Sequence, residues 1–129
     1  MASALGVGGD AGSGEIGTGL IPGDCIVGKP TPMQGVPGGI DTVAVKHKSG
    51  GLSSLGFKSY DQGRRTFQGT LKHLVWLDEE PPIDVYEEAM LRLTATVPGE
   101  DNGLMLCTFT PLLGLSKVAL RFLPELAPQ

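Results

Sequence analysis

The sequence predicts an α/β fold with a mainly parallel sheet and an additional antiparallel hairpin. Two short apolar runs, 74–77 and 104–107, have the length and composition of buried parallel strands. The segment between them repeats apolar residues at helical spacing, and a second helical pattern covers 115–123. A strand, helix, strand, helix order typically places both strands parallel in one sheet, which predicts a βαβα unit.

The first part of the chain differs in composition from the rest. The protein has 20 glycines and 10 prolines in 129 residues, and residues 1–39 carry most of these turn formers with few large apolar side chains. We therefore expect 1–39 to be poorly ordered or to depend on neighbouring structure. Residues 40–129 are expected to form the folded part.

An antiparallel hairpin is predicted within residues 42–58. The stretch 42–47 alternates as a strand does, and 52–58 forms a second strand. Between them Gly50 and Gly51 can adopt positive φ in the hairpin loop. A polar connector over 60–69 then leads into the apolar strand over 72–77.

That strand ends in three consecutive carboxylates, Asp78, Glu79 and Glu80, followed by two prolines. A core does not accommodate three carboxylates, so the chain leaves the sheet at Asp78, at the edge where open α/β sheets bind ligands. An apolar strand ending in Asp-Glu is the Walker B pattern of nucleotide triphosphatases, in which the Asp holds Mg²⁺ and the Glu orients or deprotonates water. A solvated acidic turn is the alternative interpretation of the same residues.

The helix after the prolines is expected to place Ile83, Tyr86, Met90 and Leu93 on one face. The next strand, over 104–110, ends in Thr108 and Thr110. If the two strands are neighbours, carboxylates and hydroxyls converge at one crevice, as a magnesium–phosphate site requires. Trp76 and Cys107 are expected in the core.

Composition narrows the functional classes. A net charge of −4 argues against an autonomous nucleic-acid binder that relies on phosphate contacts. The two cysteines match no metal-ligand spacing and fit reduced thiols in a cytosolic protein. Because no apolar run has the length of a membrane span and the N-terminus lacks a signal-peptide layout, we expect a soluble intracellular protein.

Four segments form a distinctive set: Ser-Tyr-Asp-Gln-Gly-Arg at 59–64, Phe-Gln-Gly at 67–69, Trp-Leu-Asp-Glu-Glu-Pro-Pro at 76–82 and Thr-Phe-Thr-Pro-Leu-Leu-Gly at 108–114. In order and spacing they resemble the large terminase subunit of tailed bacteriophages, the motor ATPase that packages viral DNA into the procapsid. The resemblance extends over about 16–126 and implies the product of a phage or prophage gene. It also implies that 40–129 are the C-terminal part of the ATPase domain, which has a P-loop NTPase core of the ASCE type.

The resemblance also implies roles for single residues. Asp78 would coordinate Mg²⁺, and Glu79 would be the catalytic carboxylate for ATP hydrolysis. Thr108 and Thr110 would lie in the coupling motif, which links phosphate state to movement. Arg64 or Arg65 would reach the γ-phosphate of its own or a neighbouring subunit, or both arginines are solvated surface charges.

The implied cofactors are Mg²⁺ and ATP. The implied partners are double-stranded DNA, the portal protein, the small terminase subunit and further copies of the subunit in a homo-oligomeric ring. No membrane partner is implied. The implied location is the portal vertex of the procapsid in the cytoplasm of the bacterial host.

One departure from the family limits these expectations. The sequence contains no G-x-x-x-x-G-K-[ST] loop, and the glycine-rich stretch 6–14 has no lysine. Family members carry this Walker A loop upstream and a nuclease domain downstream. We therefore expect a fragment, from a truncated or split gene, that binds nucleotide weakly or not at all and is inactive alone.

Two other functions stay open. A metal-dependent nuclease or phosphohydrolase would use Asp78, Glu79 and Glu80 with Asp61, although consecutive acids diverge and two-metal sites need carboxylates from several elements. The other is a non-enzymatic fragment that interacts with the portal or the small terminase subunit through exposed apolar surface.

Overall fold

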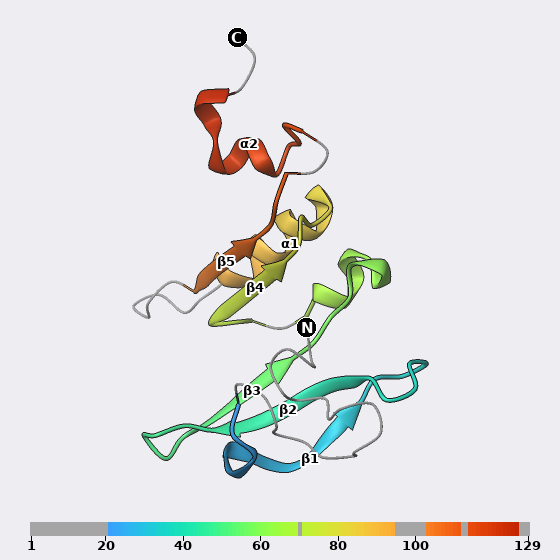
Figure 1. Ribbon diagram of the computed structural model, residues 1–129, viewed down its shortest axis with the longest axis vertical. Coiled ribbons are helices and arrows are strands. Elements are labelled where there is room, and N and C mark those ends of the chain that lie inside the picture. The colour runs from blue at the N-terminus through green and yellow to red at the C-terminus, as the bar shows by residue number, and fades with distance from the viewer. Residues whose placement is uncertain (1–20, 70, 95–102, 112–113, 127–129) are drawn as a thin grey trace. The chain divides into compact units, whose positions relative to one another are not determined.

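The computed structural model describes residues 21–69, 71–94, 103–111 and 114–126. The chain divides into two compact units, 1–58 and 59–129, and each is described by itself (Figure 1). The glycine-rich stretch 6–14 and positions 112–113 of the fourth resembling segment lie outside the described residues, as does the first half of 1–39.

The first unit is a three-stranded antiparallel sheet. Its strands are β1 (Ile26–Pro32), β2 (Ile40–Lys46) and β3 (Leu52–Gly56), in the order β1-β2-β3. The predicted hairpin is confirmed: β2 pairs antiparallel with β3, and Gly50 in its loop has a φ of 83°. Strand β1 was not predicted, and it follows a short 3₁₀ turn at Gly23–Cys25.

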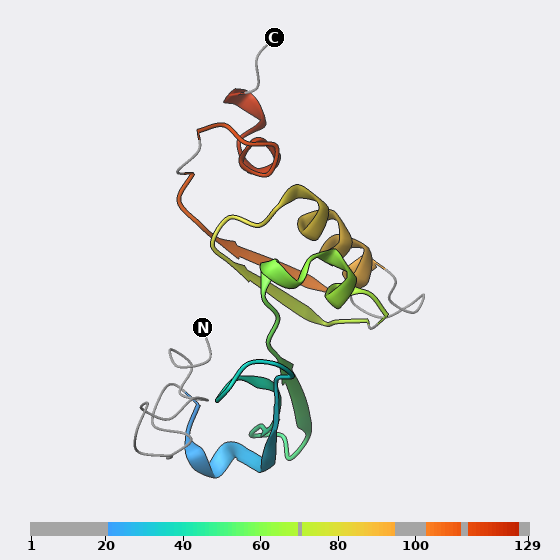
Figure 2. The ribbon, with the colours of Figure 1, turned by 90° about the vertical axis from the view of Figure 1, so that its right-hand side faces the viewer.

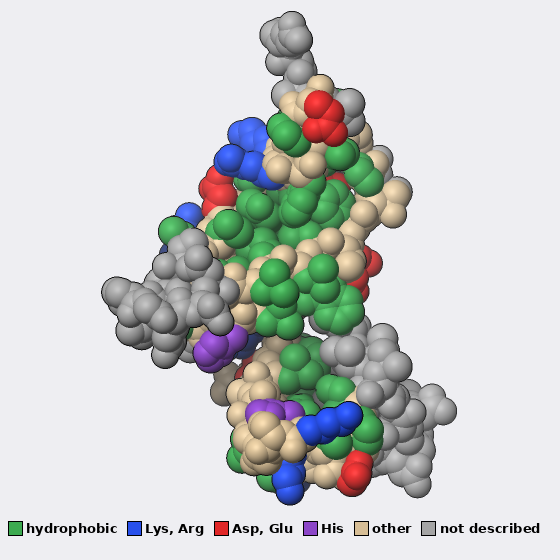
Figure 3. Space-filling model, turned by 90° about the vertical axis from the view of Figure 1, so that its left-hand side faces the viewer, with side chains coloured by type: hydrophobic (Ala, Val, Ile, Leu, Met, Phe, Trp, Pro, Cys, Tyr) green, Lys and Arg blue, Asp and Glu red, His purple; other side chains and the backbone are tan. Residues whose placement is uncertain are grey.

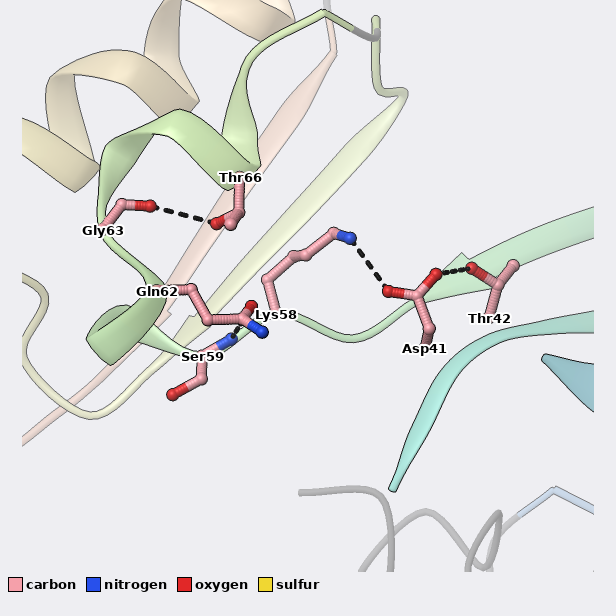
Figure 4. Close-up of polar contacts among 7 residues, drawn as sticks. All are labelled: Asp41, Thr42, Lys58, Ser59, Gln62, Gly63 and Thr66. Carbon is pink, nitrogen blue, oxygen red and sulfur yellow. Dashed lines mark hydrogen bonds and ion pairs between the residues drawn. The ribbon is translucent and has the colours of Figure 1, made fainter. Parts of the chain in front are cut away.

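A small core holds this sheet together. Val43 and Phe57 are buried, and five partly buried apolar side chains pack against them: Ile21, Ile26, Ile40, Val45 and Leu55. At the edge of this core the Lys58 ammonium lies 3.0 Å from Asp41 Oδ1, and the Thr42 hydroxyl donates to Asp41 Oδ2 (Figure 4).

The second unit carries the predicted strand, helix, strand unit. Strand β4 (Leu74–Asp78) pairs parallel with β5 (Leu104–Thr108), and helix α1 (Ile83–Thr94) connects them. The α/β class and the parallel pair are confirmed. The described strands form two separate sheets, a parallel one of two strands and an antiparallel one of three, so the parallel sheet is smaller than predicted and the hairpin belongs to a sheet of its own. The second helix, α2 (Ala119–Phe122), is shorter than predicted. Short 3₁₀ helices flank these elements, at Tyr60–Gln62, Arg64–Phe67 and Pro124–Leu126.

Helix α1 lies against both strands (Figure 2). Its buried apolar residues are Val85, Ala89 and Leu93, four residues apart, and Leu77 of β4 is buried too. The predicted face is wrong except at Leu93, because Met90 is 37% exposed and Ile83 and Tyr86 are half-buried. The buried apolar face of α1 consists of Val85, Ala89 and Leu93.

Other side chains of the parallel sheet remain exposed, contrary to the expectation that β4 is buried on both faces. These are the aligned pairs Leu74 with Leu104 and Trp76 with Leu106. Side chains alternate between faces along a strand, and among the described residues no second layer covers these positions. Trp76 is therefore not a core residue, and hydrophobic side chains are visible at the surface (Figure 3). Cys107 on β5 is half-buried.

Within the described ranges, no helix combines the length and hydropathy that crossing a membrane would require.

Candidate functional site

The parallel register brings Asp78 and Thr108 together at the ends of β4 and β5. The two residues are direct partners in the strand pairing. The Thr108 hydroxyl donates a hydrogen bond of 2.9 Å to Asp78 Oδ1. The predicted convergence of a carboxylate and a hydroxyl at one sheet edge is thus confirmed, because parallel strands end at the same edge.

Trp76 extends this contact into a chain of hydrogen bonds. Its indole Nε1 donates to Thr108 Oγ1 over 2.7 Å. Because that hydroxyl accepts from Trp76, its single proton is directed toward Asp78. The sequence did not reveal this role for Trp76. The available signal was its position two residues before Asp78, which places both side chains on the same face of the strand.

Glu79 turns the chain out of the sheet. Its N–H donates to the Thr108 carbonyl over 2.8 Å, which extends the parallel pairing by one residue. Its φ is then 67°, the only positive value at a non-glycine position among the described residues. That left-handed conformation is unfavourable for an L-residue with a side chain. The Glu79 carboxylate is therefore placed by an unusual backbone, immediately after Asp78.

Tyr60 lies behind this turn. Its single hydroxyl proton is shared between the carbonyl oxygens of Asp78, at 2.9 Å, and Glu79, at 3.2 Å. Burial raises the pKa of Tyr60 to about 12, with further contributions from the charges of Cys107, Asp78 and Glu79. The sequence placed Tyr60 in a resembling segment but assigned it no role.

The turn that carries Tyr60 is fixed by its own hydrogen bonds. The Ser59 side chain accepts from the N–H of Asp61. The Gln62 side chain accepts from the N–H of Ser59 (Figure 4). This capping box satisfies donors at the start of the 3₁₀ turn. Gly63 ends the turn with a φ of 70°, which glycine adopts without strain.

An open cleft of about 1070 Å³ lies beside the strand ends. Its polar lining combines carboxylates, hydroxyls and one ammonium, from Glu79, Glu80, Thr108, Thr110, Ser116 and Lys117. Thr108 therefore joins the cleft to Asp78. A divalent cation that binds through one or two carboxylates and substrate oxygens fits this set of groups.

The two candidate arginines lie on the 3₁₀ helix before β4. Arg64 is exposed, and its Nε is 4.0 Å from Glu88 Oε2 of α1. Glu88 is buried and pairs more closely with Arg92, at 2.8 Å. Arg65 is exposed. Within the described part of the chain, no ion pair joins either arginine to Asp78 or Glu79.

Asp61, the fourth acid of the nuclease interpretation, lies in the same 3₁₀ turn as Tyr60. Among the residues that the structure describes, no three His, Cys, Asp or Glu side chains are grouped closely enough to hold a metal ion.

Comparisons with known proteins point in one direction. Residues 35–129 match the family described as terminase large subunit, T4likevirus-type, N-terminal. The large terminase subunit of Salmonella phage P22 is 38% identical over 115 residues, which cover 84% of this chain and 22% of that protein. The chain thus spans about a fifth of the length of this relative. No solved structure matches the 129-residue chain.

Proposed function

Since this chain belongs to the family of phage terminase large subunits, we propose that it forms part of the ATP-hydrolysing motor that drives DNA into the procapsid. The observation that carries the proposal is the pairing of Asp78 with Thr108 at the ends of two parallel strands, followed at once by Glu79. An apolar strand that ends in Asp followed by Glu has the Walker B order, and the adjacent cleft has room for phosphates.

Each residue of the site has a proposed task. Asp78 would hold Mg²⁺, with the Thr108 hydroxyl fixing the orientation of its carboxylate. Bound Mg²⁺ would supply neutralisation of the negative charge on the β- and γ-phosphates. Glu79 would orient and deprotonate the attacking water. Thr110 lines the same cleft and would take part in sensing the terminal phosphate.

The γ-phosphate arginine is proposed to be Arg64 or Arg65. Arg64 lies near the buried Glu88 and is 57% exposed, so its guanidinium can still reach outward. Arg65 is exposed on the same 3₁₀ helix. Charge that develops on a transferred phosphoryl group is stabilised by such a guanidinium, from the same or a neighbouring subunit.

The partners follow from the proposed activity. They are double-stranded DNA, the portal protein, the small terminase subunit and further copies in a ring, at the portal vertex in the bacterial host. These 129 residues contain no G-x-x-x-x-G-K-[ST] sequence, so the loop that cradles the phosphates would come from polypeptide outside them.

A chimera tests the proposal. The matching stretch of the phage P22 large terminase subunit is replaced by this chain, and steady-state ATP hydrolysis is measured. We expect activity that Glu79→Gln lowers by about 100-fold or more, since a positioned general base contributes at least that much. The matched control is Glu87→Gln, because Glu87 is 59% exposed on α1; it should retain nearly full activity.

A folded, active chimera whose ATP hydrolysis is unaffected by Glu79→Gln would contradict the proposal.

The metal site is tested on the isolated chain with Mn²⁺, a paramagnetic substitute for Mg²⁺. We expect Mn²⁺ to broaden the amide signals of Asp78, Glu79 and Thr108 in NMR spectra, and Asp78→Asn to abolish that broadening. Broadening elsewhere in the chain would place the ion at another site and contradict the proposal.

A further inference from the structure

We propose that Tyr60 is a positioning residue: its hydroxyl holds the backbone of Glu79 in the left-handed conformation and thereby aims the Glu79 carboxylate. We call the contacts of the Tyr60 hydroxyl with the Asp78 and Glu79 carbonyls the clamp; it is a property of this chain. The consequence for ATP hydrolysis rests on the proposed function, because it requires Glu79 to act on water.

The hydrogen bonds fix the peptide planes on both sides of Glu79. The plane before it is held by Glu79 N–H donating to the Thr108 carbonyl and by the Asp78 carbonyl accepting from Tyr60. The plane after it is held because the Glu79 carbonyl shares the same phenol proton. With both planes fixed, φ and ψ of Glu79 are fixed as well, and only the side-chain torsions remain free.

The left-handed conformation needs this support. It is unfavourable for a residue that carries a Cβ, and glutamate lacks the short side chain with which Asn or Asp supports this geometry. Glycine would remove the unfavourable energy but also the carboxylate. A hydrogen bond to a backbone carbonyl is strong enough to offset backbone strain of this kind. Removing the Tyr60 hydroxyl should therefore release Glu79 from the left-handed conformation.

The phenol is itself held in place. Tyr60 begins a 3₁₀ turn closed by the Ser59–Gln62 capping box, and its ring is half-buried. The contact joins positions 18 and 19 residues apart in sequence. The segment 59–64 thus sets the backbone conformation of Glu79, and with it the direction of the Glu79 carboxylate.

NMR of the isolated chain tests the clamp directly. A residue with positive φ has an unusually short distance between its amide proton and its own Hα, which gives a strong intraresidue cross peak. We expect this strong peak at Glu79 in the wild type and its loss, to the level of strand residues, in Tyr60→Phe. Tyr86→Phe is the matched control, because it removes the other phenol of the chain and should leave the peak unchanged. A strong Glu79 peak that persists in Tyr60→Phe overturns the proposal.

If Tyr60→Phe fails to fold, rescue decides. Glycine adopts positive φ unaided, so adding Glu79→Gly to Tyr60→Phe should restore a folded spectrum. Failure of this rescue would assign the phenol another structural role and also overturn the proposal.

In the chimera, Tyr60→Phe should lower kcat for ATP hydrolysis with little change in KM, and it should have no further effect in the Glu79→Gln background. An inactive parent chimera would count against the proposed function and leave the NMR result standing. A Glu79 cross peak that is unchanged in Tyr60→Phe would refute the positioning role of Tyr60 and leave the proposed function untouched.

Discussion

The hydroxyl of Tyr60 lies where a phenolate would be strongly disfavoured. Burial is the largest contribution to its raised pKa, and the charges of Cys107, Asp78 and Glu79 add to it. The folded pKa is about 12 against an ordinary value of 10.0. The folded state therefore binds more protons than the unfolded state between these two values. Stability from this group is fully present below pH 10 and is lost as the pH rises toward 12.

Ultraviolet titration measures this difference. Tyr86→Phe leaves Tyr60 as the only phenol of the chain, so the rise in phenolate absorbance belongs to it alone. We expect a midpoint near 12 in the folded protein and near 10 in denaturant, with thermal stability falling across the same interval. A folded midpoint near 10 would show that the phenol is freely solvated.

At this scale the sequence predicted the meeting of Asp78 with Thr108, because both follow apolar runs that end at one sheet edge. It did not predict the left-handed Glu79 or the partners of Trp76 and Tyr60. The backbone conformation of Glu79 depends on a carbonyl of β5 and a phenol from the connector. Contacts between segments so distant in sequence leave no local pattern.

Gly103, just before β5, shows how closely the elements approach one another. A Cβ at this position would lie 2.8 Å from the Lys72 carbonyl oxygen and 2.6 Å from Leu93 Cδ2. Backbone cannot move aside cheaply, so we expect Gly103→Ala to lower the free energy of unfolding by about 1–3 kcal/mol, as overpacking does. Urea unfolding followed by circular dichroism measures it.

The control for this substitution is Gly56→Ala. Its nearest neighbour is 3.9 Å away, an ordinary contact, so its effect should stay near zero or be slightly stabilising. Equal effects at the two glycines would mean that the space beside Gly103 is not tight.

Helix α1 is tied to the connector through Glu88. This carboxylate is 5% exposed, 2.8 Å from Arg92 and 4.0 Å from Arg64. Glu88→Gln removes the charge but keeps the shape. We expect it to lower the free energy of unfolding by about 1–3 kcal/mol, below the cost of breaking a fully buried pair because both arginines retain contact with water.

Glu87→Gln provides the comparison on the same helix. Glu87 lies 3.9 Å from Arg121, and both side chains are about 60% exposed. Exposed pairs of this kind contribute about 0–1 kcal/mol, so chemical denaturation should barely distinguish this variant from the wild type. A similar loss in both variants would exclude a special role for Glu88.

At the scale of elements, helix α1 was predicted from its two prolines and apolar repeat, but its inward face was not. The period of a helix is local, whereas the side that turns inward is set by the strands it packs on. The same limit applies to β4: an uninterrupted apolar run permits burial on both faces, yet Trp76 and Leu74 remain exposed among the described residues.

For the whole chain, the hairpin of the first unit and the strand, helix, strand unit of the second were predicted. Strand β1 was missed, because Gly28, Pro30 and Pro32 are poor strand residues. The structure accommodates them at an edge of the sheet, where the register with β2 shifts after Val27 and again after Thr31. Proline is tolerated at such edges and bulges because fewer backbone donors are needed there. The P-loop NTPase core remains a prediction.

Nucleotide binding by the 129-residue chain is predicted to be very weak. Glu79, Glu80 and Lys117 line the cleft. The two carboxylates repel a polyphosphate unless Mg²⁺ neutralises part of the negative charge. Backbone amides and a lysine of a Walker A loop normally provide most of the attraction for the β- and γ-phosphates, and this sequence has no such loop. Isothermal titration with Mg-ATP should give no saturable heat at micromolar concentrations. The Mn²⁺ experiment on the same sample serves as the control for an intact Asp78 site. Saturable micromolar binding would mean that the strand ends hold nucleotide without that loop.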